Sequence, residues 1–286
     1  MSVNVTTSFV EQYSANVQML SQQMGSLLRG AVDVESIKGK NAFFEQIGSV
    51  TAQVRTSRHG ATPQIDTPHS RRRLNTATYE WADLIDDADK IRMLIDPTSS
   101  YAKAAAAAMG RAMDTVIITA ALGTAYTGVS GGTSTSLPSG QKIAHGSAGL
   151  TVAKLLSAKK ILDQNNIDPS VKRWCVVSPE QVEDLLNTTE VKSSDYNTVK
   201  ALAMGDINSF LGFSFITSNL LTQDATPNRQ VIAFAADGIK LGIGKDITAK
   251  ISERDDKSYS TQVYYSMDLG STRMEEEKIV EIACVE

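Results

Sequence analysis

The chain has 286 residues, with 28 basic and 32 acidic side chains and a net charge of −4 at neutral pH. Hydrophobic residues make up 42% and charged residues 21%, which excludes an intrinsically disordered chain. The slight acidity argues against a protein whose whole surface binds nucleic acid, because phosphate binding needs a clustered positive face. The length allows one large domain or two moderate ones.

Cysteine usage and the absence of targeting signals point to a cytoplasmic protein. Cys175 and Cys284 both lie in apolar runs, so we expect buried free thiols in a reducing compartment. The N-terminal segment has no basic start followed by an apolar core. The longest apolar stretch, 116–122, is far short of the ~20 residues of a membrane span. We therefore expect a protein that is made in the cytoplasm and stays there, with no membrane partner.

An amphipathic helix is predicted near the N-terminus. Its apolar residues recur alternately three and four positions apart: Val10, Tyr13, Val17, Leu20, Met24 and Leu27. This spacing places a narrow apolar stripe on a helix of about five turns that ends at Gly30. Such a stripe suits packing on one neighbouring surface, which another subunit is able to supply.

The segment 46–78 contains few large apolar residues and no helical period. Residues 50–54 alternate between apolar and polar side chains, as in a strand with one solvated face. His59–Gly60 marks a turn, and residues 74–79 are expected to form the return strand. We predict a long two-stranded arm. A lone hairpin is marginal in water, so the arm is expected to lie on another surface.

A long helix is predicted from Thr98 to Leu122. Asp96 and Pro97 provide a capping side chain followed by a proline suited to the first turn. The helix would be roughly 37 Å long. Alanine has the highest helix propensity and a small side chain, so other backbones can approach such a helix closely. The residues expected to allow this close packing are Ala104, Ala105, Ala106, Ala107, Ala108 and Gly110.

The rest of the chain alternates helices with strands after a Gly/Ser/Thr-rich segment, 123–149. Helices are predicted at 150–164 and 179–187 and strands at 174–177, 210–217 and 230–235, followed by a tail with period-two segments at 247–251, 259–267 and 280–284. The predicted class is α+β, with antiparallel strands concentrated at the C-terminal end.

Catalytic and metal-site templates do not fit this sequence. The glycine-rich run 238–246 lacks the spacing and the following Ser or Thr of a phosphate-binding loop, and a tight hairpin is the better interpretation. His59, His69 and His145 have no paired ligand at metal spacing and are expected to be exposed loop residues. We therefore expect no enzyme activity and no cofactor or metal.

Two charged clusters are candidate contact sites between subunits. The basic cluster is Arg71, Arg72 and Arg73, and the acidic cluster is Asp83, Asp86, Asp87 and Asp89. Without interleaved aromatic residues, three arginines are a poor nucleic-acid footprint. Calcium-loop spacing is absent from the acidic cluster, which is interpreted as an exposed or partner-facing helix turn. One hypothesis is that the two clusters pair across subunits, where many weak contacts add up.

The whole chain resembles the major capsid proteins of tailed bacteriophages. The resemblance is carried by 22–29 (QQMGSLLR), by 81–101, which begins at Trp81 and ends in DPTSSY, by 109–114 (MGRAMD) and by 123–128 (GTAYTG). It is most specific from 79 to 128. It implies the Johnson fold, in which an N-terminal arm, an extended loop, a peripheral domain with a spine helix, and an axial domain follow one another.

The resemblance also implies a domain organisation and partners. The N-terminal arm would be 1–47, the extended loop 48–80, the peripheral domain 81–145 and 230–286 with spine helix 98–122, and the axial domain 146–229. Copies would form the hexamers and pentamers of an icosahedral or prolate shell around double-stranded DNA. The implied partners are other copies of the chain, a portal protein, and scaffolding and cement proteins.

One departure from some members of the family is the lack of lysine between Lys40 and Lys90. Those members weld subunits through an isopeptide bond from a loop lysine, so welding through this loop is not expected. An encapsulin-like nanocompartment with the same fold is the nearest alternative, although the N-terminal helical arm and the phage-like segments disfavour it. A soluble α/β enzyme using the acidic cluster is the alternative from another class, and no motif supports it.

Overall fold

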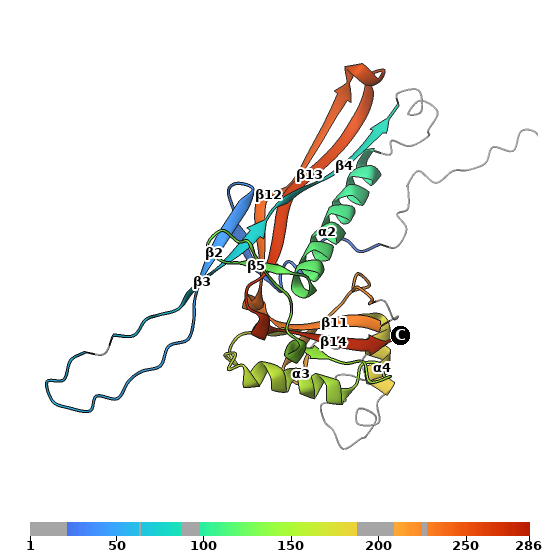
Figure 1. Ribbon diagram of the computed structural model, residues 1–286. Helices are drawn as coiled ribbons and strands as arrows, with labels where there is room; N and C mark the ends of the chain where they lie inside the picture. The colour runs from blue at the N-terminus through green and yellow to red at the C-terminus, as the bar shows by residue number, and fades with distance from the viewer. Residues whose placement is uncertain (1–21, 63, 87–97, 188–208, 225–227) are drawn as a thin grey trace, which may run out of the picture.

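The computed structural model describes residues 22–62, 64–86, 98–187, 209–224 and 228–286. These residues form an elongated upper unit, a compact lower unit and a thin loop that projects from between them (Figure 1). Three sheets and three α-helices account for the regular structure of this part of the chain. The mixture of helices and mainly antiparallel sheets confirms the predicted α+β class.

The upper unit is built on a four-stranded sheet in the order β1-β12-β13-β4. Its strands are β1 (Asp33–Ser36), β4 (Ala77–Ile85), β12 (Ile239–Arg254) and β13 (Ser260–Arg273). β1 runs parallel to β12, and the other pairs are antiparallel. β12 and β13 form a long hairpin whose tip is the short 3₁₀ turn Asp255–Lys257. This hairpin gives the upper unit its length (Figure 1).

Helix α2 (Thr98–Leu122) packs along this sheet, mainly against β13. Its buried side chains include a row at every fourth position, which lies on one face of the helix: Ala105, Met109, Met113, Ile117 and Ala121. By length and composition alone α2 could cross a membrane. Half of it is buried inside the protein, which is also the pattern of a core helix.

A second four-stranded sheet lies where the projecting loop joins the body, in the order β2-β3-β5-β6. Its strands are β2 (Asn41–Ile47), β3 (His69–Asn75), β5 (Ala125–Thr127) and β6 (Thr133–Thr135). Its inner face buries a small core of Ile37, Phe44 and Leu74. The β3 strand leads almost directly into β4, so this sheet is continuous in sequence with the upper unit.

The lower unit contains a six-stranded sheet in the order β7-β14-β11-β8-β10-β9. Its strands are β7 (Lys142–Ile143), β8 (Arg173–Val177), β9 (Ser209–Phe210), β10 (Phe213–Thr217), β11 (Asn228–Ala235) and β14 (Ile279–Val285). Helices α3 (Val152–Gln164) and α4 (Pro179–Asn187) lie beside it (Figure 1). Thr151 caps α3, because its side chain accepts a hydrogen bond from Lys154 N. One hydrophobic cluster joins this unit to α2.

Most predicted elements are present, including the helix over 98–122 and the strands of the tail. Several predictions are wrong. His69, expected in a loop, is the first residue of β3. Residues 22–29 of the N-terminal helix form bends and turns, and the remainder of that prediction lies outside the described residues. Residues 50–54 form no strand, because the paired region lies earlier, in β2. The run 238–246 is no hairpin: most of it continues into β12, where Gly242 lets Ile37 pack against the strand.

Glu286 ties the end of β14 to neighbouring segments. Its carboxylate accepts hydrogen bonds from Arg229 at 2.6 and 2.8 Å. The side chains of Gln181, Ser178 and Gln223 donate three more, at 2.7–3.0 Å. The Arg229 hydrogen bond, followed by those of the other donors, lowers the pKa of Glu286 to about 2. The carboxylate is therefore more stable as an anion in the folded chain.

We expect Glu286→Gln to destabilise the unassembled chain by about 1–3 kcal/mol at neutral pH. A pKa depressed from 4.5 gives stabilisation that is fully present above pH 4.5 and is lost as the pH falls through about 2. Urea unfolding between pH 2 and 7 measures the difference between wild type and variant. Glu253→Gln, on the exposed half of β12, is the matched control. A difference that is equally large at pH 2 and pH 7 would contradict the assignment.

Candidate functional site

The three arginines on β3 divide between the two faces of their sheet. Successive side chains of a strand point to opposite faces, so Arg71 and Arg73 share one face and Arg72 takes the other. Arg71 Nη2 lies 2.6 Å from Glu45, and its guanidinium is 5.7 Å from the ring centroid of Phe43. The sequence run therefore does not act as one basic patch.

Arg72 is buried and pairs with Glu276 of its own chain. The same carboxylate contacts Arg273, whose Nε lies 3.4 Å from it and whose side chain is fully buried. Arg273 also donates to the carbonyls of Ala121 and Gly123 at the end of α2. Through these contacts β3, at the base of the projecting loop, is linked to the end of α2 and to the segment that follows β13. No sequence pattern pointed to Arg273 or Glu276 as part of a site.

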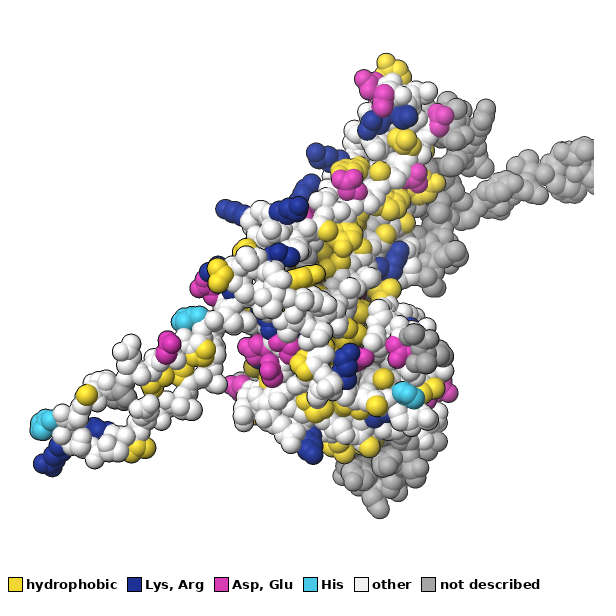
Figure 2. Space-filling view, viewed as in Figure 1, with side chains coloured by type: hydrophobic (Ala, Val, Ile, Leu, Met, Phe, Trp, Pro, Cys, Tyr) yellow, Lys and Arg dark blue, Asp and Glu magenta, His cyan; other side chains and the backbone are white. Residues whose placement is uncertain are grey.

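Arg73 is held on the other face of the sheet. Its guanidinium lies 4.9 Å from the ring centroid of Tyr126. Gly131, at φ 64°, lies against its stem, where a Cβ would come within 2.6 Å of Arg73 Cβ and Cδ. Glycine is therefore required at position 131 by both conformation and space. Figure 2 shows basic and hydrophobic side chains side by side near this base of the loop.

The acidic cluster is only partly described. Asp83 and Asp86 are both exposed, Asp83 on β4 and Asp86 just beyond its end, whereas Asp87 and Asp89 lie outside the described residues. The prediction of a helix turn is wrong for Asp83, because β4 extends through it to pair with β13. Within one chain the structure does not bring Asp83 to the arginines of β3. Pairing between subunits stays a prediction.

The alanine run alternates between buried and half-buried positions on α2. Ala105 and Ala107 are buried, and Ala104, Ala106 and Ala108 are half-buried. Gly110 makes a close backbone approach, since a Cβ there would lie 2.3 Å from the carbonyl carbon of Gly25. A role of the alanines in contacts between shell subunits stays a prediction.

Residues 22–28 are anchored on α2 beside Gly110, a contact that the sequence did not predict. The fully buried Asp114 accepts hydrogen bonds from the Ser26 hydroxyl and the Gln23 amide, at 2.5 and 2.6 Å. It also accepts from Leu27 N and Leu28 N. Four hydrogen-bond donors thus compensate the buried carboxylate. A carboxylate on an apolar helix face needs such donors, because it is removed from water. The signal in the sequence that could have indicated this anchor is an aspartate, Asp114, within a strongly apolar helix.

Ala106→Trp is expected to impair assembly more than folding of the single chain. Ala106 is half-buried, so an indole there can reach solvent in the isolated subunit but would occupy space that a neighbour needs. Thermal melting of the unassembled chain and electron microscopy of particles measure the two effects. Lys103→Trp, at an exposed position of the same helix, is the control for bulk. Normal shells from Ala106→Trp would rule out close packing at this position.

The projecting loop, residues 48–68, is almost entirely exposed where it is described. It includes Val54 at 88% exposure, and it extends far from the body of the chain (Figure 1). Its ends are closed by a hydrogen bond from Gly48 N to Pro68 O. Among the described residues nothing covers this loop, so its apolar side chains are available to another molecule.

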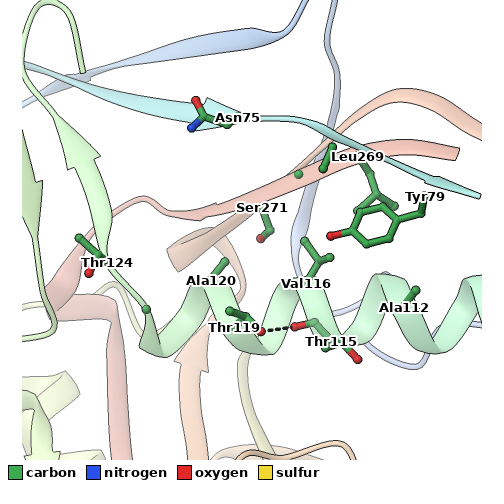
Figure 3. A pocket seen from close by; sticks show the side chains of 13 residues that line it. Asn75, Tyr79, Ala112, Thr115, Val116, Thr119, Ala120, Thr124, Leu269 and Ser271 are labelled. Atoms are coloured by element: carbon green, nitrogen blue, oxygen red, sulfur yellow. Dashed lines mark hydrogen bonds between the residues drawn. The ribbon is translucent and has the colours of Figure 1, made fainter. Parts of the chain in front are cut away.

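The groove beside α2 carries no catalytic constellation. A groove of about 570 Å³ between α2, β4 and β13 is lined by hydroxyl and small apolar groups, including Tyr79, Thr115 and Ser271 (Figure 3). No carboxylate, histidine or cysteine lines it. In the described part of the chain no group of three or more His, Cys, Asp or Glu residues is placed to hold a metal. Burial raises the pKa of Cys284 to about 11, as expected for an inert thiol.

Comparisons with known proteins agree on one family. A family model described as phage capsid protein matches residues 5–286. No curated protein matches the chain. The capsid of cyanophage P-SCSP1u is similar in structure, with a TM-score of 0.78, 20% identity, and 100% of this chain and 96% of that chain covered.

Two further structures show the same fold. A structure of Mycobacterium phage Che8 has a TM-score of 0.73 and 18% identity, covering 96% of this chain and 97% of that one. The capsid of a native GTA particle has a TM-score of 0.73 and 12% identity, covering 99% and 98%. The predicted Johnson fold of tailed-phage capsids is therefore confirmed. The chain belongs to the phage capsid protein family and is a structural protein of the virion capsid shell.

Proposed function

We propose that this chain is the major capsid protein, which forms hexamers and pentamers and encloses double-stranded DNA in an icosahedral or prolate shell. The observation that carries the proposal is the match of the family model to nearly the whole chain, together with a fold that covers entire phage capsid subunits. The net charge of −4 suits a shell that surrounds nucleic acid without binding it tightly.

The shape of the subunit supports an assignment of its segments to separate structural roles in the shell. We assign the N-terminal arm to 1–47, the extended loop to 48–80, the peripheral domain to 81–145 and 230–286, and the axial domain to 146–229. The six-stranded sheet combines β8, β9 and β10 of the proposed axial domain with β7, β14 and most of β11 of the proposed peripheral domain. The extended loop would lie on a neighbouring copy, which explains its exposed apolar residues.

The proposed partners are other copies of the chain, a portal protein, and scaffolding and cement proteins. Assembly would take place in the cytoplasm of the bacterial host. Because the loop has no lysine, interlocked arms or a cement protein would strengthen the shell. High-mass ladders in denaturing gels of mature particles would contradict the absence of covalent welding.

Expression of the chain alone and with phage scaffolding protein tests the proposed function. Size-exclusion chromatography is expected to show large assemblies, and negative-stain microscopy to show closed shells with hexameric and pentameric units. Nuclease-protected DNA in particles from infected cells would support genome enclosure. A chain that stays monomeric or dimeric under all conditions would contradict the proposal.

A further inference from the structure

On the outer face of the β2-β3-β5-β6 sheet, apolar side chains are exposed beside arginine side chains. We call this surface the Arg73 face and define it by Phe43, Ile47, Arg73, Tyr126 and Val129. Its four apolar side chains are 41%, 69%, 38% and 87% exposed, in the same order. Arginine among exposed aromatic residues is the composition typical of the centre of protein interfaces. The sequence hides this pattern, because the aromatic residues come from neighbouring strands.

Cross-strand pairing creates the pattern. Phe43 lies opposite Arg73 on β2, and Tyr126 lies opposite Arg73 on β5. Directly opposed side chains on one face are close enough to interact. The basic run thus has aromatic neighbours on both sides, although none is adjacent to it in the sequence.

Arg73 is the arginine of the run that has no acidic partner among the described residues. Arg71 pairs with Glu45 and Arg72 with Glu276, whereas no carboxylate within the described ranges lies at salt-bridge distance from Arg73. Contacts with Tyr126 and Gly131 hold its side chain in place. A carboxylate arriving from outside would therefore meet an immobilised guanidinium, which lowers the entropic cost of pairing.

The matching acidic group lies at the far end of the same molecule. Asp83 is exposed on β4, the strand that borders the upper sheet in the described structure. Thr76 alone separates β3 from β4, and both strands are extended, so Arg73 and Asp83 lie about 30 Å apart. Figure 1 shows β4 continuing from β3 toward the upper end of the molecule, so that the end of β4 lies far from β3. One chain cannot pair these two residues with each other.

We propose that the Arg73 face docks a second copy of this chain through the Asp83 end of its β4. Arg73 pairs with the carboxylate, and Phe43, Ile47 and Tyr126 supply the apolar contact. The two patches differ, so the contact is head-to-tail and repeats from copy to copy, as rings and shells require. The inference rests on the proposed shell function and adds the partner surface and the residues that define it.

A charge swap tests the contact. Arg73→Glu and Asp83→Arg are each expected to lower the yield of assembled particles at least about tenfold, and the double variant to restore it. Arg254→Glu, whose partner Asp256 lies in its own hairpin, is the matched control and is expected to assemble normally. Thermal melting of each unassembled variant reports on folding. Asp83 is exposed, so its variant remains informative if Arg73→Glu folds poorly.

Normal assembly of Asp83→Arg would overturn the inference, as would a folded double variant that does not recover assembly. If the Arg73 face bound the genome instead, Arg73→Glu would form normal empty shells that retain less DNA, and this also overturns it. A wild-type chain that forms no shells contradicts the proposed function. In that case sedimentation velocity of the same variants measures self-association and so tests the contact. Unchanged self-association of Asp83→Arg would overturn the inference.

Discussion

Replacing Arg273 with methionine is expected to lower the free energy of unfolding by about 3–5 kcal/mol. Arg273 is fully buried and donates hydrogen bonds of 2.8–3.0 Å to the carbonyls of Ala121, Gly123 and Thr135. It also lies beside the buried carboxylate of Glu276. Methionine keeps much of the volume and removes every donor, which leaves buried acceptors without partners.

Urea unfolding followed by circular dichroism measures this loss on the unassembled chain. Arg254→Met, at the exposed tip of the β12–β13 hairpin, is the control and is expected to change stability by less than about 0.5 kcal/mol. Arg273→Lys should fall between the two, since lysine keeps the charge but not the planar set of donors. A loss below about 1 kcal/mol for Arg273→Met would show that the buried pairs contribute little.

Gly110→Ala is expected to destabilise the chain, although alanine normally favours a helix over glycine by about 1 kcal/mol. The new Cβ would lie 2.3–2.6 Å from three backbone atoms of Gly25, which cannot rotate away as a side chain can. Overpacking of this kind costs about 1–3 kcal/mol. The sign of the effect therefore separates a close backbone contact from ordinary helix propensity.

Hydrogen exchange at the amides of Leu27 and Leu28 reports the contact directly, because both donate to Asp114 in the anchored segment. We expect their protection to fall in Gly110→Ala. Gly30→Ala is the matched control, since no other atom lies within 4 Å of its added Cβ. Higher stability of Gly110→Ala with unchanged protection would mean that residues 22–28 are not held against α2.

The basic run on β3 shows the limit of sequence patterns. Three adjacent arginines look equivalent in the sequence, but the strand turns Arg72 into the protein and Arg71 and Arg73 outward. Their partners, Glu276, Glu45 and Tyr126, come from three other segments. The helix turn predicted for the acidic cluster is likewise wrong at Asp83, because pairing of β4 with β13 overrides the local preference of this segment.

The sequence alone determined the elements whose signals are local. Propensity and spacing placed the helix from Thr98 to Leu122, and strict alternation placed the strands of the tail, because both depend on residues within a few positions. Motifs spread along the chain were enough to indicate the capsid family.

Only the tertiary structure decided how the charged residues are used. The Arg72–Glu276 pair spans 204 positions, and the hydrogen bonds of Asp114 with residues 23–28 span 86–91. Such pairs depend on the order of strands in a sheet and on the path of the chain over a helix, which no local pattern encodes. Burial then selects the partners, since a charge removed from water is stable only beside groups that compensate it.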